Sequence, residues 1–302
     1  MVDMRVNVGG LEMKNPVTNC SGTFESGKPY SDFVDVAKLG AVTAKGMSPV
    51  PWQGNETPRM CEIYGGMINC IGLQNDGVEA WIENDYPWLK DKGAKIIANV
   101  CGHSLEEYVQ VIEVLEDVEV DAYEVNISCP NVSCGGASLG TDPKAASNVI
   151  SACRKATSKT ISAKLTPNVT DITIIAKAVQ EAGADALSLI NSVQGMAIDA
   201  KTRKPKISRV IGGMAGPCLK PIALKCVYQC WQATKMPIIG MGGICSGEDA
   251  VEFMLAGASA VGIGFSNFID PTSTTRIIFE LEQFCEEQGV KRVSDLTGGL
   301  LC

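Results

Sequence analysis

The sequence predicts an α/β fold, a (β/α)8 barrel, and three observations support this prediction. Eight short apolar runs alternate with longer segments of helical periodicity, which is typical of parallel α/β architecture. The length of 302 residues is usual for a barrel of this kind. No Gly-x-Gly-x-x-Gly motif follows an early strand, which argues against a doubly wound open sheet. We therefore expect a single TIM-barrel domain over residues 1–302.

The eight expected strands are short and end in polar or glycine-rich sequence. They cover residues 16–21, 41–46, 96–100, 122–128, 161–166, 184–191, 237–243 and 260–265. Ser104 begins a capping-box pattern, and Ser246 begins a similar one with a shorter acid, so both are expected to start helices. Gly183 and Gly257 are expected to end the helices that they follow.

Two segments are longer than a simple barrel requires. Residues 1–15 contain the turn Val-Gly-Gly-Leu and predict an N-terminal β-hairpin that plugs the closed end of the barrel. Residues 194–220 follow the sixth strand, are rich in glycine and lysine, and predict an extended loop insertion. Long ordered loops in compact domains usually serve function.

Composition excludes several classes of protein. The net charge of −8 and the isoelectric point near 4.9 argue against a nucleic-acid partner, which needs a basic face. We see no signal peptide and no apolar run long enough to span a bilayer, so we expect a cytoplasmic protein without a membrane segment. The thirteen cysteines are scattered and form no Cys-x-x-Cys pair, so neither disulfides nor a metal site is expected.

One cysteine lies where a catalytic base is needed. Cys129 follows the expected strand 122–128, in the sequence Asn-Ile-Ser-Cys-Pro-Asn, and a glycine-containing loop comes after it. The chain has a single histidine, His103, so a proton acceptor at this strand end must come from another residue type. The alternative is that Cys129 is a small buried apolar residue, as most free cysteines are.

Polar residues and glycines gather at the expected strand ends. The carboxyl ends of barrel strands face one mouth, so these residues converge there. They are Ser21, Gly22, Lys45, Gly46, Asn99, Asn126, Cys129, Lys164, Asn191, Ser192, Gly242, Gly243 and Gly264. Glycines at the ends of strands seven and eight predict a phosphate site built from backbone amides, to which residues 212–216 could add. The whole set suits a flat, polar, anionic ligand.

Lys45 and Lys164 each lie inside an apolar strand. A buried ammonium without a partner is costly, so each lysine needs an anion nearby. A structural salt bridge remains an alternative for either lysine alone. Together, beside a phosphate site, they favour a cofactor whose negative charge rises during turnover, such as a flavin.

The chain resembles the class 1 dihydroorotate dehydrogenases, and within them the class 1B catalytic subunit. The resemblance extends nearly end to end. It rests on residues 15–24, 45–46, 69–75, 126–131, 140–142, 164–171, 195–199 and 239–244. Segments 164–171 and 195–199 look like class 1B hallmarks.

This resemblance implies one FMN and a pyrimidine substrate at the barrel mouth. The implied FMN contacts are Ser21, Lys45, Gly46, Asn99, Asn126, Lys164, Ile190, Gly216, Gly242, Gly243, Gly264 and Phe265. The implied contacts to dihydroorotate or orotate are Lys45, Asn69, Cys70, Ile71, Gly72, Leu73, Asn126, Asn191 and Ser192. Cys129 would remove the C5 proton while hydride passes from C6 to flavin N5, and Lys164 would stabilise the flavin anion.

The resemblance also implies a partner and a pathway. Class 1B subunits pass electrons to NAD⁺ through a subunit that holds FAD and a [2Fe-2S] cluster, in a heterotetramer with a homodimeric core, for pyrimidine (UMP) biosynthesis. Three alternatives remain open at this point. They are a class 1A-like enzyme that uses fumarate, a dihydropyrimidine dehydrogenase-type enzyme that acts on uracil or thymine, and a non-catalytic barrel that binds FMN or a sugar phosphate.

Overall fold

An eight-stranded parallel sheet forms the centre of the molecule in the computed structural model, which describes residues 2–128, 133–134 and 137–301. Its strands are β3 (Val17–Asn19), β4 (Val42–Thr43), β7 (Ile96–Val100), β8 (Ala122–Asn126), β11 (Thr160–Lys164), β12 (Ala186–Leu189), β17 (Ile238–Met241) and β18 (Ala260–Ile263). The order across the sheet is β3-β18-β17-β12-β11-β8-β7-β4. Consecutive strands of this set are paired, except for β3 and β4 at the two ends, and β3 pairs with β18. Seven of the predicted runs contain one of these strands whole, and β11 begins one residue before its run, at Thr160. The (β/α)8 prediction is confirmed.

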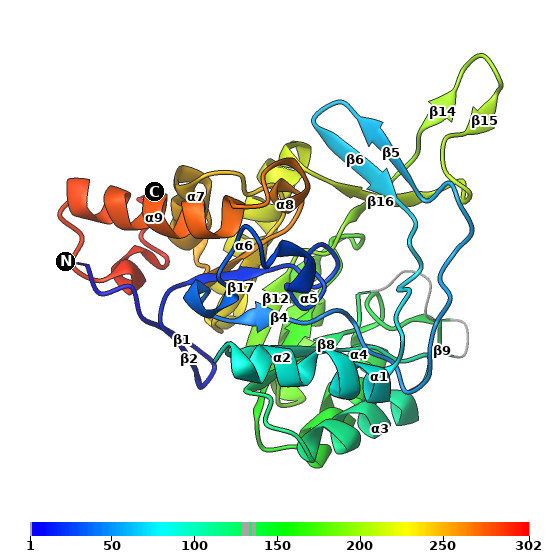
Figure 1. Ribbon diagram of the computed structural model, residues 1–302, viewed down its shortest axis with the longest axis horizontal. Helices are drawn as coiled ribbons and strands as arrows, with labels where there is room; N and C mark the ends of the chain where they lie inside the picture. The colour runs from blue at the N-terminus through cyan, green and yellow to red at the C-terminus, as the bar shows by residue number, and fades with distance from the viewer. Residues whose placement is uncertain (1, 129–132, 135–136, 302) are drawn as a thin grey trace.

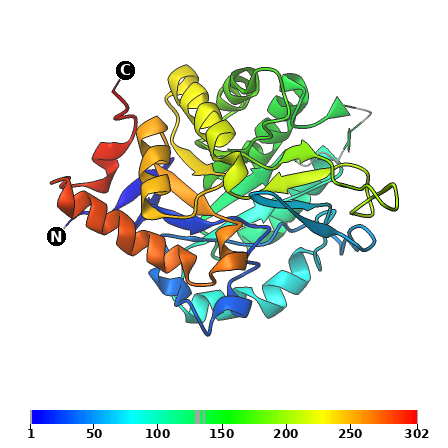
Figure 2. The same ribbon diagram turned by 90° about the horizontal axis from the view of Figure 1, so that it is seen from above.

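Helices surround the sheet (Figures 1 and 2). They are α1 (Val78–Asn84), α2 (Tyr86–Asp91), α3 (Leu105–Glu116), α4 (Pro143–Ala156), α5 (Ile172–Glu181), α6 (Lys220–Thr234), α7 (Gly247–Ala256), α8 (Ser266–Ile269) and α9 (Ser273–Glu287). Between β3 and β4 the chain forms only the 3-10 turns η1 (Lys28–Tyr30) and η2 (Val36–Lys38). Two further 3-10 turns are η3 (Pro217–Leu219) and η4 (Val293–Leu296).

The predicted helix caps are present, with one difference. Ser246 caps α7 in a complete capping box with Asp249. Ser104 caps α3 by accepting a hydrogen bond from the Glu107 backbone N–H, but the Glu107 carboxylate accepts from the backbone N–H of His103. The second half of that capping box is therefore displaced by one residue. Gly257 ends α7 as predicted.

The barrel closes between its first two strands through a side chain. The Asn19 amide donates to the Thr43 carbonyl at 2.7 Å and accepts from the Thr43 backbone N–H at 3.0 Å. The hydroxyls of Thr18 and Thr43 are hydrogen-bonded to each other at 3.0 Å, and all three residues are buried. Asn19 therefore occupies the place of a neighbouring strand at this seam.

The N-terminal hairpin closes the end of the barrel where the strands begin, opposite the mouth formed by their carboxyl ends. It consists of β1 (Val6–Val8) and β2 (Leu11–Met13), which pair antiparallel. The carbonyl of Gly9 accepts from the hydroxyl of Thr160, the first residue of β11. Gly9 has φ +61°, and a Cβ there would lie 2.6 Å from the Asp185 carbonyl oxygen, so the turn requires glycine. The predicted plug is confirmed.

A second, four-stranded sheet stands beside the barrel (Figure 1). Its order is β13 (Val193–Gly195), β16 (Gly212–Ala215), β6 (Gly66–Asn69) and β5 (Met60–Ile63). Two further antiparallel pairs are β14 (Ile198–Asp199) with β15 (Lys204–Pro205) and β9 (Ser133–Cys134) with β10 (Ala137–Ser138). The prediction of an extended loop over 194–220 is not confirmed, because short strands, η3 and the start of α6 fall within it.

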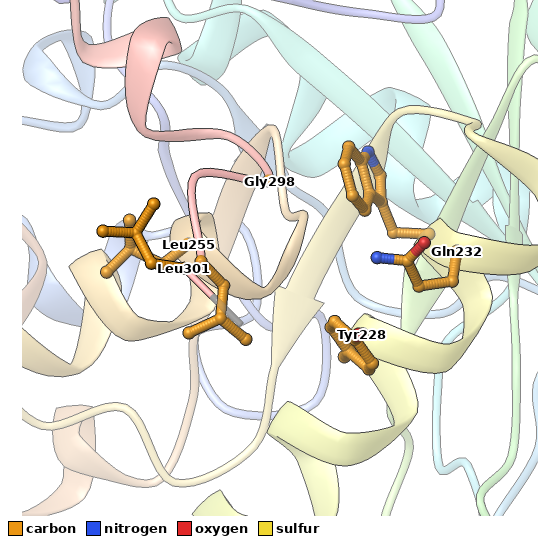
Figure 3. Close-up of a pocket in the computed structure, with 7 residues that line it drawn as sticks. Tyr228, Gln232, Leu255, Gly298 and Leu301 are labelled. Atoms are coloured by element: carbon orange, nitrogen blue, oxygen red, sulfur yellow. The ribbon is translucent and has the colours of Figure 1, made fainter.

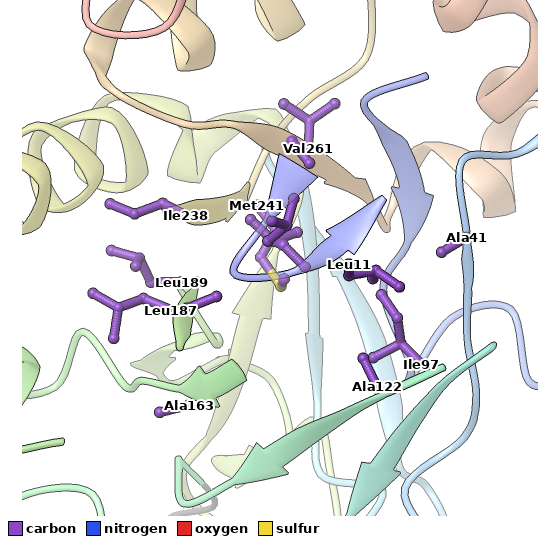
Figure 4. Packing of buried hydrophobic residues seen from close by; sticks show 14 of the residues in the cluster. Leu11, Ala41, Ile97, Ala122, Ala163, Leu187, Leu189, Ile238, Met241 and Val261 are labelled. Atoms are coloured by element: carbon purple, nitrogen blue, oxygen red, sulfur yellow. The ribbon is translucent and has the colours of Figure 1, made fainter. Parts of the chain in front are cut away.

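The core fills the barrel interior and the layer between strands and helices. Figure 4 shows Leu11 of the hairpin among side chains from the barrel strands, including Ile97 and Met241. A smaller cluster of Ile68, Cys70 and Ile207 lies under the second sheet. In the described ranges no helix combines the length and apolar character needed to cross a bilayer.

We expect Asn19→Leu to lower the free energy of unfolding by roughly 2–4 kcal/mol, because it leaves the buried N–H and C=O of Thr43 unpaired. Chemical denaturation measures the change. The matched control is the double variant Thr18→Val/Thr43→Val, which removes both partners of a hydroxyl pair at the same seam and should cost less than about 1 kcal/mol. Equal losses in both variants would contradict the closing role of Asn19.

Candidate active site

The predicted site residues lie at the carboxyl ends of the barrel strands, as the sequence analysis expected. Asn99, Asn126 and Lys164 lie on β7, β8 and β11, and the others follow directly after a strand, except for residues 69–73 and 216. Asn69 ends β6, and Gly216 follows β16, so the second sheet supplies these two. Cys129 lies outside the described residues.

A buried ion pair lies at the centre of this mouth. The Lys164 ammonium is 3.0 Å from Glu124 Oε1, and the two side chains are 6% and 1% exposed. The Asn99 amide donates to the same carboxylate oxygen at 2.5 Å, and the Ser21 hydroxyl lies 3.4 Å from the ammonium. Sequence reasoning missed Glu124, although a charged residue within the apolar run 122–128 was a usable signal.

Two opposing influences act on Lys164. Burial is the largest and favours the neutral amine, but the charge of Glu124 and the hydrogen bond to it raise the pKa of Lys164 above its ordinary value. Lys164 is therefore an ammonium at neutral pH. The structural salt bridge considered for this lysine exists.

Lys45 differs from Lys164 in having no anion beside it. Its side chain is half-buried just after β4, next to Gly46. Its ammonium makes no hydrogen bond or ion pair with any residue that the structure describes. A half-buried cation without a protein counter-ion is suited to an anionic ligand at the mouth.

The glycines after β17 form a closely packed turn against α6. Gly243 has φ +84°, and a Cβ there would lie 2.8 Å from the Lys220 backbone nitrogen and 3.0 Å from the Gly216 carbonyl oxygen. A Cβ on Gly242 would lie 3.4 Å from the side chain of Ile190. Residues 190, 216, 242 and 243, which are far apart in the sequence, are thus brought together.

Several backbone amides at these turns have no protein acceptor. Among the residues described, the N–H groups of Gly216, Gly242, Gly243 and Gly264 donate no hydrogen bond. The ends of β17 and β18 are adjacent, because Met241 is in register with Gly262. Unpaired amides on adjacent strand ends are suited to the oxygens of a phosphate.

The thiol of Cys20 lies at the mouth, on the segment after β3. Cys20 donates from its Sγ to the Gly262 carbonyl at 3.3 Å, and a Cβ on Gly264 would lie 3.1 Å from that Sγ. Burial raises the pKa of Cys20 to about 12, so this thiol stays protonated at neutral pH. Cys20 is therefore unsuited to the role of base. Phe265 follows Gly264 and precedes α8.

A hydrogen-bonded amide cluster leads up to position 129. Asn126 accepts from the hydroxyl of Ser128 at 2.7 Å, and the amide of Asn191 donates to that hydroxyl at 2.6 Å. The Tyr108 hydroxyl donates to the Asn126 carbonyl at 2.8 Å, and Ser192 donates its backbone N–H to Asn191 at 2.7 Å. Ser128 and Tyr108 were not predicted, because their role depends on contacts between separate strands and helices.

The segment 69–73 reaches the mouth from the second sheet. Asn69 pairs with Gly213 of β16, and the side chain of Leu73 lies 3.8 Å from the Cβ position of Gly46. Asn55 holds this loop through two hydrogen bonds. Its side-chain amide donates to the Cys70 carbonyl, and its backbone N–H donates to the Ile71 carbonyl. Gly72 packs against Asn55 as well. The Cys70 thiol points instead to the smaller core cluster, 3.5 Å from the Ser208 hydroxyl.

A separate cavity of about 400 Å³ lies between α6, α7 and the C-terminal segment (Figure 3). Its lining residues are Tyr228, Trp231, Gln232, Leu255, Gly298, Leu300 and Leu301. None of the predicted site residues is among them. Its lining is mainly apolar and aromatic, with no acid, lysine or cysteine for proton transfer.

Comparison with known proteins identifies the family to which the chain belongs. The family model described as dihydroorotate dehydrogenase matches residues 3–285. A relative from Alkaliphilus metalliredigens, dihydroorotate dehydrogenase B (NAD(+)), catalytic subunit, is 50% identical over 299 residues and 99% of both chains. Proteins of the same name from Pelobacter propionicus and Parabacteroides distasonis are 50% and 49% identical over 301 residues, again across 99% of both chains. The chain therefore belongs to the dihydroorotate dehydrogenase family.

Proposed function

We propose that this chain is the catalytic subunit of an NAD⁺-linked dihydroorotate dehydrogenase, which oxidises dihydroorotate to orotate in pyrimidine biosynthesis. The observation that carries the proposal is the composition of the barrel mouth in a chain matched end to end by such subunits. The mouth combines a buried ammonium at Lys164 with a cation at Lys45 and backbone amides that have no partner among the described residues. These groups suit two anions, a phosphorylated cofactor and a carboxylate substrate.

FMN is the flavin that these residues fit. The amides of Gly216, Gly242, Gly243 and Gly264, which have no acceptor in the described part of the chain, would hold its phosphate. Phe265 and Ile190 lie beside them. Ser21, Lys45, Gly46, Asn99, Asn126 and Lys164 would contact the rest of the cofactor. When bound, FMN supplies the two-electron acceptor for the hydride that leaves C6 of the substrate.

The substrate would lie between Lys45 and the amide cluster. Lys45 would pair with the carboxylate of dihydroorotate, and segment 69–73 with Asn126, Asn191 and Ser192 would supply hydrogen bonds to the ring. This requirement for a carboxylate favours dihydroorotate over uracil or thymine, which lack one.

Cys129 would act as the base that removes the C5 proton. Two features around it support this role. It follows Ser128, whose hydroxyl joins the amides of Asn126 and Asn191, so the chain enters position 129 from a fixed point. Cys20, a described thiol at this mouth, is kept protonated by burial. Only the thiolate form of Cys129 can accept the proton, so its surroundings must favour that form.

Electrons would leave the subunit for NAD⁺ through a partner. The matched relatives are named as catalytic subunits of an NAD(+) enzyme, which is the support for this part of the proposal. We propose that the partner holds FAD and a [2Fe-2S] cluster, and that two catalytic subunits form the core of a heterotetramer.

Replacing Cys129 should separate chemistry from cofactor binding. We expect Cys129→Ala to retain the yellow flavin spectrum and to lower kcat by about 10²–10⁴-fold, the usual contribution of a general base. Cys129→Ser should retain slightly more activity. Steady-state oxidation of dihydroorotate measures both, and Cys61→Ala is the control for loss of a thiol elsewhere. Normal turnover by the Cys129→Ala variant would assign the base to another residue.

Replacing Lys45 should weaken substrate binding. We expect Lys45→Gln to raise the Kd for orotate by about 10–150-fold, because it removes one charge-assisted hydrogen bond to the carboxylate. Titration of the flavin spectrum with orotate measures this change. Lys38→Gln, which removes the same charge from an exposed position, should leave the Kd unchanged. An unchanged Kd in the Lys45 variant would place the carboxylate elsewhere.

The electron acceptor can be tested on the native complex. We expect the protein purified from its own cells to bring with it a second subunit containing FAD and iron, and to reduce NAD⁺ with dihydroorotate. In the FMN-loaded chain alone, dihydroorotate should bleach the flavin absorbance. This chain should reduce neither NAD⁺ nor fumarate at a comparable rate. Rapid fumarate reduction by the chain alone would instead indicate the class 1A-like alternative.

A further inference from the structure

Glu124 is a buried acid that the proposed reaction does not use. It is 1% exposed and lies on β8, two residues before Asn126, so both side chains point to the same face of the strand. The register pairs Glu124 with Asn99 on one side and with Ser162 on the other. Its carboxylate therefore lies just below the strand ends, under the place proposed for the flavin.

We propose that Glu124 is a positioning residue that keeps Lys164 in its charged form and holds the ammonium at the barrel mouth. This inference rests on the proposed function, in which Lys164 contacts the cofactor. We take its role there to be the one that the family resemblance implies, which is to stabilise negative charge on the reduced flavin. Asn99 has a supporting part, because its amide donates to the same oxygen, Glu124 Oε1, that contacts Lys164.

Among the described groups around Lys164, Glu124 is the one that can keep its ammonium charged. Among the residues that the structure describes, three titratable groups face the ammonium: Glu124 from β8, Cys20 from the segment after β3, and Cys101 from the segment after β7. Of these only Glu124 is a carboxylic acid, and burial holds Cys20 as a neutral thiol. The remaining contact is the neutral hydroxyl of Ser21 at 3.4 Å. Without the carboxylate, burial would favour the uncharged amine of Lys164.

A purely structural ion pair makes a different prediction. If the pair only fills the barrel interior, its loss would change the stability of the fold. It would then shift the midpoint potential of the bound flavin by the same amount at every pH. If Glu124 maintains the charge of Lys164, its loss makes that charge dependent on pH. The midpoint potential of the bound flavin reports this charge directly, because a nearby ammonium favours the anionic reduced form.

The test uses the FMN-loaded Glu124→Gln variant, with its flavin midpoint potential measured from pH 6 to pH 10 against the wild-type protein. We expect its potential to be at or above the wild-type value at pH 6 and to fall progressively below it as Lys164 loses its proton. The rate of flavin reduction by dihydroorotate should fall by about 100-fold relative to wild type at pH 10, the cost of losing one charge-stabilising donor.

Two further variants complete the experiment. Glu124→Gln/Lys164→Gln should follow the same pH profile as Lys164→Gln, because no titrating lysine remains. Glu124→Asp keeps the charge but is one methylene shorter, and should show a smaller drop in the same direction. It serves as the test if Glu124→Gln does not fold. A constant offset from the wild-type potential at every pH, or a wild-type profile, would overturn the inference.

Failure of this inference is distinguishable from failure of the proposed function. Wild-type protein that binds no FMN, or whose flavin does not bleach with dihydroorotate, contradicts the function itself. Wild-type protein that does both, combined with a Glu124→Gln profile parallel to its own, contradicts only the role of Glu124.

Discussion

Closure of the eight-stranded sheet is the constraint on which every other feature of this molecule depends. Backbone pairing accounts for seven of the junctions, and the amide of Asn19 completes the eighth by bonding both backbone groups of Thr43. Once the sheet is closed, its strand ends must meet around one opening. Ser21 and Lys164 therefore lie in contact although 143 positions separate them along the chain.

The closed sheet also explains how charge is tolerated inside it. A parallel barrel buries both faces of its strands, so the side chains of Glu124 and Lys164 are almost fully buried and each needs the other as its counter-ion. Asn99 and Ser21 take up further hydrogen-bonding capacity of the pair. Lys45, one strand end away from this network, has no such partner among the described residues and is therefore suited to an anionic ligand.

The sequence predicted the barrel well because its strands are short, apolar and regularly spaced. Seven fall within the expected runs, and β11 begins one residue before its run. Strand-end residues such as Lys164 and Gly243 could be placed at the mouth for the same reason. Pairings between distant segments could not be predicted. The contact of Glu124 with Lys164, the bond from Tyr108 to Asn126 and the strands within 194–220 all depend on partners that local pattern does not identify. Cys129 lies outside the described residues, so its role rests on sequence and on its neighbours.

The pairing of β6 with β16 limits which mutations this protein can accept during evolution. β6 leads into segment 69–73, and β16 leads into Gly216. The pairing of these two strands therefore sets the relative position of the long segments that follow barrel strands β4 and β12. A single-residue insertion in either strand would reverse which side chains face inward along it. Insertions and deletions should therefore accumulate in the β14–β15 hairpin, beyond the ladder, and mutations in the two paired strands should be acceptable only in compensating combinations.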